Sequence, residues 1–264
     1  MGNWPLFTTA LTLPFFHRFL TGMIVAGIVI FFLLCFIDAG YGQYIDRRWG
    51  RTIANRVGWL IMELPVVVLF FLYWITSDRS FAITPLVFFL LFNLHYCQRT
   101  FVFPLLIRGD DRMPWTIVFF GMLFNTANAY MQGAWIFHLS PENLYTPDWL
   151  TTPQFIIGAI IFLTGLVVNL HSDRIIRRLR APGDTAFHIP RGGLFEQVSS
   201  AQYLGELIEW IGWAILTLSW SGLVFALWTF ANLVPRARRN HAWYLEKFGE
   251  AYPRDRKRII PYVY

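Results

Sequence analysis

The chain has 264 residues, of which 56% are hydrophobic and only 14% are charged, and its formal net charge is +6. Soluble globular domains carry charge on about 25% of their residues, so this composition excludes an ordinary soluble domain. The positive charge does not indicate nucleic-acid binding, because the basic residues lie between apolar runs rather than on one continuous patch.

The apolar residues gather into runs of about 20, the length of helix that crosses the roughly 30 Å hydrocarbon core of a bilayer. We therefore predict an all-α polytopic membrane protein, a single domain over residues 1–264, with about seven spanning helices. The predicted spans are Leu20–Ile37, Val57–Ile75, Phe81–Ile107, Trp115–Leu139, Phe155–Leu170, Tyr203–Leu218 and Leu223–Val234. Only Ser219–Gly222 separates the last two runs, and we expect a tight helical hairpin there.

The basic residues predict the orientation of these spans. If the N-terminus lies outside, the loops after the first, third and fifth spans and the C-terminal tail all face the cytoplasm. These segments hold 19 of the 22 lysines and arginines. Because cytoplasmic loops of membrane proteins are enriched in basic residues, we predict a cytoplasmic C-terminus. The membrane would be a bacterial inner membrane, or the endoplasmic reticulum in a eukaryote.

Glu63 lies in the middle of the second apolar run, just before Pro65. Ionisable residues inside a membrane are costly and often functional. One interpretation is a hydrogen bond between packed helices beside the Pro65 kink. The other is a neutral acid that donates a hydrogen bond to a ligand carbonyl.

The third span ends in a polar cluster of His95, Tyr96, Arg99 and Thr100. Their spacing places several of them on one helix face. They either form an interhelical network, or Tyr96 reaches a ligand while Arg99 meets a phosphate or carboxylate.

The fifth span also ends in polar residues, with Asn169, Asp173, Arg177 and Arg180 about one helical turn apart. This pattern is typical of a salt-bridged helix end. It also suits amide and carboxylate groups that hold ribose and nicotinamide, with arginines that hold phosphates.

Two acids, Glu206 and Glu209, lie three residues apart on the sixth span and imply a polar interior. Gly192–Gly193 allows close approach of the backbone to a phosphate, although alone it indicates only a turn. No GxGxxG motif supports a Rossmann domain. The basic tail, with His241, Tyr244, Tyr252 and Arg254–Arg258, either lies on the membrane surface or contributes to the site.

Taken in order, these segments resemble the steroid 5α-reductases. The similarity runs from the second span to the C-terminus and is densest after Asn169. The matching segments are Glu63–Pro65, Leu94–Tyr96, Arg99–Val102, Asn169–Asp173, Leu179–Arg180, Pro182–Gly183, Ile189–Pro190, Gly192–Phe195, Gly205–Gly212, Tyr244–Leu245, Tyr252–Pro253 and Ile260–Pro261.

The resemblance implies a membrane oxidoreductase that uses NADPH at its cytosolic side to reduce a 3-oxo-Δ4 steroid held deeper among the helices. It implies that Glu63 and Tyr96 bind the 3-oxo group and that Trp59 lines the steroid pocket. The implied cofactor region is mainly 169–264, and its contacts match Asn169, Asp173, Arg180, Glu206, Arg236, Tyr244 and Arg256.

Several positions depart from the family pattern. Met62 stands where a steroid-contacting glutamine often precedes the glutamate, and Gln202 replaces a cofactor-binding asparagine. Asn240 falls where a histidine is expected, with His241 beside it, and Trp228 and Asn232 replace phenylalanines that would face the ligand. The preferred substituents on the steroid are therefore open.

Other functions remain open at this point. A related membrane reductase would act on a sterol ring or a fatty enoyl thioester, and a membrane methyltransferase would bind S-adenosylmethionine instead of NADPH. A transporter or lipid-binding receptor would use the same buried polar groups without catalysis. We expect no metal site, because Cys35 and Cys97 lack metal-type spacing. The expected partners are the steroid or a similar enone lipid and the bilayer, with no nucleic acid and no obligate protein partner.

Overall fold

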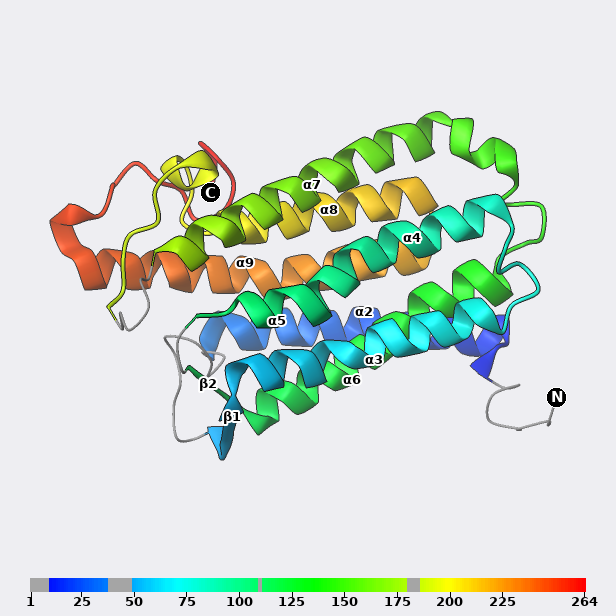
Figure 1. Ribbon diagram of the computed structural model, residues 1–264, viewed down its shortest axis with the longest axis horizontal. Coiled ribbons are helices and arrows are strands. Elements are labelled where there is room, and N and C mark those ends of the chain that lie inside the picture. The colour runs from blue at the N-terminus through cyan, green and yellow to red at the C-terminus, as the bar shows by residue number, and fades with distance from the viewer. Residues whose placement is uncertain (1–9, 38–48, 109–110, 180–185) are drawn as a thin grey trace.

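The computed structural model describes residues 10–37, 49–108, 111–179 and 186–264. These residues are mostly helical. The long helices are α2 (Leu13–Phe36), α3 (Asn55–Ile75), α4 (Ile83–Cys97), α6 (Trp115–Ala134), α7 (Pro153–Arg178), α8 (Ala201–Thr217) and α9 (Trp220–Phe248). They lie side by side in one elongated bundle, and helices adjacent in sequence run in opposite directions (Figure 1).

Each predicted span contains helix, and four helices of the described chain are long and apolar enough to cross a membrane: Leu13–Phe36, Asn55–Ile75, Ile83–Leu106 and Pro153–Arg178. Their outer surfaces carry exposed large apolar side chains, such as Phe32, Val68, Leu90 and Ile160. Such a surface suits contact with lipid. The helical fold is confirmed, whereas the number of spans and the orientation of the termini stay predictions.

Several helices extend beyond the apolar runs that predicted them. α7 continues to Arg178 and α9 continues to Phe248, well past the predicted ends at Leu170 and Val234. Helical hydrogen bonding does not depend on a lipid environment, so a helix does not end where its apolar residues end. The predicted turn near Ser219 is present: Leu218 has φ +42° and the Ser219 side chain accepts a hydrogen bond from the Gly222 amide at 3.0 Å.

Short elements complete the bundle. The third predicted span is α4 followed by a π-helical turn at Gln98–Val102 and by α5 (Phe103–Leu106). Pro104 cannot donate an amide hydrogen bond to the preceding turn, which favours such an irregularity. The strands β1 (Thr52–Ala54) and β2 (Arg112–Pro114) pair antiparallel, with Ile53 opposite Met113, and set the starts of α3 and α6 side by side. These strands were not predicted, because three residues are too few for an alternating pattern.

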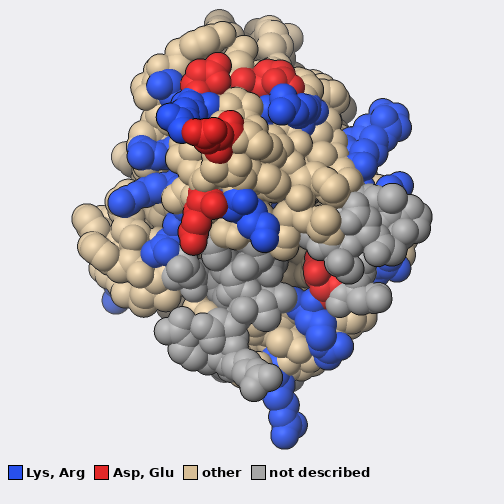
Figure 2. Space-filling model, turned by 90° about the vertical axis from the view of Figure 1, so that its left-hand side faces the viewer, with Lys and Arg blue, Asp and Glu red and all other residues tan. Residues whose placement is uncertain are grey.

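The basic segments gather at one end of the bundle. The β1–β2 pair, the ends of α5 and α7, and the C-terminal segment all lie at the left in Figure 1. Seen from that side, the surface carries many lysine, arginine and acidic side chains (Figure 2). The C-terminal segment is tied down there, because the Ser199 amide donates to the Lys257 carbonyl at 2.8 Å and the Lys257 amide donates to the Gln197 carbonyl at 2.8 Å.

Glycines bring α7 and α8 into backbone contact. A Cβ on Gly205 would lie 2.4 Å from the Asn169 backbone nitrogen, and a Cβ on Gly165 would lie 2.2 Å from that of Glu209. Small residues permit this approach between membrane helices. The contact places Asn169 on α7 directly against the α8 turn that carries Gln202 and Glu206.

We expect Gly205→Ala to destabilise the protein by about 1–3 kcal/mol, because the new methyl group would push against backbone rather than against a movable side chain. Thermal unfolding in detergent measures the effect. Gly22→Ala is a suitable control, because no atom of the described residues lies within 4 Å of the position that its Cβ would take. Equal melting temperatures for Gly205→Ala and the unsubstituted protein would show that the two backbones are not in contact.

Candidate active site

Glu63 on α3 is buried, with 7% of its surface exposed. Its Oε2 accepts a hydrogen bond from Asn125 Nδ2 at 3.0 Å, and the same nitrogen donates to the Met62 carbonyl at 2.8 Å. Asn125 lies on α6, so this contact fixes Glu63 between two helices. The Met62 side chain points toward α6, where it packs against Gly121.

Tyr96 on α4 is also buried, and Asn128 Nδ2 on α6 donates a hydrogen bond to its hydroxyl oxygen at 2.9 Å. Asn125 and Asn128 lie three residues apart on one face of α6, so the two groups that they bind, Glu63 and Tyr96, lie on the same side of that helix. The structure thus brings the two predicted carbonyl-binding groups into one buried polar centre.

Arg99 links this centre to α7 and α8. Its Nη1 lies 3.0 Å from Asp173 Oδ2 and its Nη2 lies 3.1 Å from Glu206 Oε1, and all three side chains are largely buried. Its guanidinium carbon lies 4.8 Å from the centroid of the Trp59 ring and 4.3 Å from that of Phe103. Arg99 therefore forms ion pairs with two acids and cation–π contacts with two aromatic rings.

A second buried pair joins α4 to α8. His95 Nδ1 lies 2.9 Å from Glu209 Oε1, and both residues are almost fully buried. Asn169 Nδ2 donates to the Gln202 carbonyl at 3.0 Å and approaches Glu206 Oε1 at 3.4 Å. Five predicted site residues, namely Arg99, Asn169, Asp173, Gln202 and Glu206, therefore share one region between α4, α7 and α8.

The predicted residues of α9 and the tail lie next to this region. Asn240 Nδ2 approaches Ser200 Oγ at 3.4 Å, and His241 Nδ1 lies 2.6 Å from Ser199 Oγ, just before α8 begins. Arg236 and Tyr244 are half-buried on the same helix. Burial lowers the pKa of the His241 imidazole. Arg180 falls outside the described residues.

Arg256 is enclosed within the tail. Its Nη1 donates to the Pro190 carbonyl at 2.8 Å, its Nη2 lies 3.5 Å from Glu196 Oε2, and the residue is 2% exposed. Tyr252, over whose ring the guanidinium lies, donates a hydrogen bond to Ser199 Oγ at 2.6 Å. These contacts anchor the segment after α7, whereas the cofactor contact of Arg256 stays a prediction.

The residues missed by the sequence analysis lie on α6 and α8. Asn125, Asn128 and Gln132 are buried amides at spacing i, i+3 and i+7, and Trp213 on α8 reaches Gln132. The helical spacing of three amides in an apolar run was a readable signal. No local pattern distinguished Trp213 from the other aromatic residues of its span.

A cavity of about 460 Å³ lies at the other end of the bundle, near the α3–α4 connection. Asp78, Arg79, His138 and Glu142 line it, and it contains no predicted site residue. Among the described residues, no cluster of histidines, cysteines and acids has the geometry of a metal site.

These features define a helical, membrane-type protein with an acid, a phenol and a buried ion-pair cluster converging inside the bundle. A family model described as 3-oxo-5-alpha-steroid 4-dehydrogenase matches residues 111–264. The chain is 44% identical over 237 residues to mouse 3-oxo-5-alpha-steroid 4-dehydrogenase 1, covering 89% of this chain and 91% of the mouse protein. It is 38% identical over 256 residues to steroid 5-alpha-reductase DET2 of Arabidopsis thaliana, covering 95% and 97% of the two chains. The human 3-oxo-5-alpha-steroid 4-dehydrogenase 1 is 40% identical over 227 residues, with 85% and 86% covered.

The chain belongs to the 3-oxo-5-alpha-steroid 4-dehydrogenase family, which is also named steroid 5-alpha-reductase. It is therefore an oxidoreductase that acts on CH–CH bonds.

Proposed function

We propose that the protein reduces the Δ4 double bond of a 3-oxo-Δ4 steroid to give the 5α-3-oxosteroid, with NADPH as reductant. The observation that carries this proposal is that one face of α6 orients two buried groups, Glu63 and Tyr96, in a bundle that also buries the Arg99–Asp173–Glu206 cluster. The names of the relatives support the substrate class.

The polar groups between α7 and α8 fit a nicotinamide dinucleotide. Among the described residues, the buried atoms Asn169 Oδ1, Gln202 Oε1 and Arg177 Nη1 have no hydrogen-bond partner. Buried polar atoms are normally paired, so these atoms suit a bound ligand. Asn169 and Gln202 offer acceptors for carboxamide and ribose donors, and Arg177 offers a donor for phosphate. Asp173, Arg180, Glu206, Arg236, Asn240, His241, Tyr244 and Arg256 would complete the cofactor contacts.

NADPH would supply the hydride that adds to C5 of the enone. As C5 gains hydrogen, the electrons of the C4–C5 double bond move toward the 3-oxo oxygen, which becomes an enolate. Glu63, in its neutral form, and Tyr96 donate hydrogen bonds to that oxygen, and these bonds strengthen as its charge grows. A proton from Tyr96 or water then adds at C4 and completes the saturated ketone. Trp59 would line the steroid pocket, and the apolar bundle would exclude water.

The test is steroid-dependent oxidation of NADPH by the purified protein in detergent, with progesterone as the probe. We expect a product that has gained two hydrogens and has 5α stereochemistry, identified by mass spectrometry and comparison with both 5-epimers. Binding of NADPH without turnover of any 3-oxo-Δ4 steroid would point to another enone, such as a sterol or a fatty enoyl thioester. A protein that does not bind NADPH would contradict the reductase assignment.

A further inference from the structure

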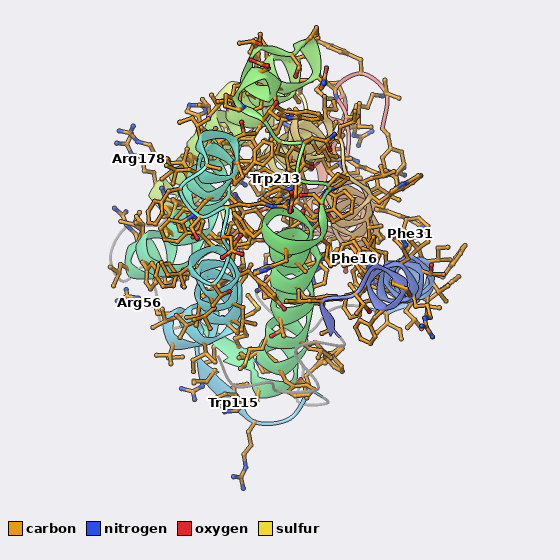
Figure 3. All side chains as sticks on the ribbon, turned by 90° about the vertical axis from the view of Figure 1, so that its right-hand side faces the viewer. Phe16, Phe31, Arg56, Trp115, Arg178 and Trp213 are labelled. Carbon is orange, nitrogen blue, oxygen red and sulfur yellow. The ribbon has the colours of Figure 1, made fainter. Side chains whose placement is uncertain are left out.

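Buried hydrogen-bonding groups form a row behind the Tyr96 hydroxyl. Asn128 Nδ2 donates to the Tyr96 oxygen at 2.9 Å, Gln132 Nε2 donates to Asn128 Oδ1 at 3.3 Å, and Trp213 Nε1 donates to Gln132 Oε1 at 3.0 Å. Asn128, Gln132 and Trp213 have no exposed surface, and Tyr96 is 4% exposed. Trp213 points into the centre of the bundle (Figure 3).

The direction of these hydrogen bonds is fixed at the far end of the row. An indole N–H is a donor and never an acceptor, so Trp213 must face the oxygen of Gln132. The Gln132 amino group then faces the Ser221 carbonyl at 3.0 Å and Asn128 Oδ1, both of which are acceptors. Turning the Gln132 amide over would set donor against donor at Trp213 and acceptor against acceptor at Ser221.

The fixed orientation of Gln132 determines that of Asn128. Because Gln132 donates to Asn128 Oδ1, the Asn128 amino group must face Tyr96. The Tyr96 oxygen therefore accepts a hydrogen bond from the protein, and its own hydrogen is left for another acceptor. Among the described residues, Tyr96 donates no hydrogen bond.

We propose that Trp213, Gln132 and Asn128 are positioning residues that make the Tyr96 hydroxyl a donor toward the substrate oxygen. This inference rests on the proposed reduction of a 3-oxo-Δ4 steroid. A tyrosine hydroxyl can donate or accept, and in a dry site its donation to Asn128 would remove it from catalysis. The row prevents that by occupying the acceptor side of the hydroxyl with an N–H group.

Helix α6, which carries Asn128 and Gln132, also orients Glu63. Asn125 Nδ2 donates both to the Met62 carbonyl and to Glu63 Oε2, so the proton of a neutral Glu63 is directed to the other oxygen. Asn125 and Asn128 are three residues apart on α6. One face of α6 thus sets the donor direction of both groups that bind the carbonyl.

Trp213→Phe tests the proposal, because it replaces the indole by a smaller aromatic ring that has no N–H donor. Without that donor, only the Ser221 carbonyl still holds the Gln132 amide, so Gln132 and Asn128 turn over more readily and can accept the Tyr96 hydrogen. We expect kcat to fall about tenfold with little change in KM, a smaller loss than the roughly 10²–10³ for deleting a donor outright. Gln132→Met also frees the Asn128 amide to turn over, and it should likewise lower kcat.

A spectroscopic measurement separates positioning from loss of structure. Infrared spectra of bound progesterone labelled with ¹³C at C3 report the strength of hydrogen bonding to its carbonyl. We expect the carbonyl stretch at lower frequency in the unsubstituted protein than in Trp213→Phe. Trp149→Phe is the matched control: it removes an indole donor that binds the Leu216 carbonyl at 2.9 Å, outside the row. Its kcat and carbonyl stretch should not change.

The outcomes distinguish the two proposals. If the unsubstituted protein reduces the steroid and Trp213→Phe has the same kcat and carbonyl stretch, the positioning role is wrong and the reductase function stands. Equal losses in Trp149→Phe and Trp213→Phe would also overturn the positioning role. If the unsubstituted protein binds the steroid without reducing it, the proposed reductase function is wrong. The carbonyl stretch then tests by itself whether the row orients the Tyr96 hydroxyl. If it neither binds nor reduces the steroid, both proposals fail.

Discussion

Replacing Glu63 by leucine is expected to lower kcat for a 3-oxo-Δ4 steroid by about 10²–10³, the usual cost of losing one donor to a developing oxyanion. Glu63→Gln should lower it at least about tenfold, because its oxygen can keep the Asn125 contact while an amide N–H replaces a more acidic carboxyl O–H. Steady-state kinetics measure both effects, and NADPH titration should show unchanged cofactor affinity.

Glu142→Gln is the control for this pair. Glu142 is an exposed acid beside the cavity at the opposite end of the bundle, and its substitution should leave kcat unchanged. Unchanged turnover in Glu63→Gln and Glu63→Leu would remove Glu63 from the mechanism.

Replacing Arg99 by leucine is expected to cost about 3–5 kcal/mol of stability, because it leaves Asp173 and Glu206 as buried acids without their shared cation. The apparent melting temperature in detergent should fall by about 6–20 °C, given roughly 2–4 °C per kcal/mol for chains of this size. Arg99→Leu should also abolish NADPH binding, because Asp173 and Glu206 both lie beside Asn169.

The melting temperature of Arg99→Lys should lie between those of the unsubstituted protein and Arg99→Leu. The lysine keeps one positive charge but cannot contact two carboxylates with the two arms of a planar guanidinium. Arg18→Leu is the matched control, since Arg18 is an exposed arginine whose Nε donates to the Pro14 carbonyl of its own helix at 3.2 Å. A melting temperature for Arg99→Leu equal to that of Arg18→Leu would show that the cluster does not stabilise the fold.

The sequence predicted most helices because a bilayer imposes a length on apolar runs. Glu63 and Arg99 were found for the same reason, since a charge inside such a run is conspicuous. The pairing of His95 with Glu209 could not be predicted, because 114 residues separate them and neither helix carries a local signal of its partner. A functional role for Trp213 could not be predicted, because indoles are common in apolar spans and the sequence does not indicate its contact with Gln132.

The α7–α8 contact also escaped prediction, although its signal was present. Gly158 and Gly165 on α7, and Gly205 and Gly212 on α8, are each seven residues apart. Two such pairs describe two helix faces that can approach closely, but the sequence does not say which helices meet. Only the three-dimensional arrangement shows that each glycine lies against backbone of the other helix.

Because these glycines leave no side chain between α7 and α8, the spacing of Asn169 from Gln202 is set by backbone against backbone. Rotation of a side chain cannot widen or narrow that gap. A dinucleotide arriving there would meet the Asn169 and Gln202 amides on backbones already at their final separation, with the Asn169 amide held on the Gln202 carbonyl. This part of the site should therefore add little to the entropic cost of binding.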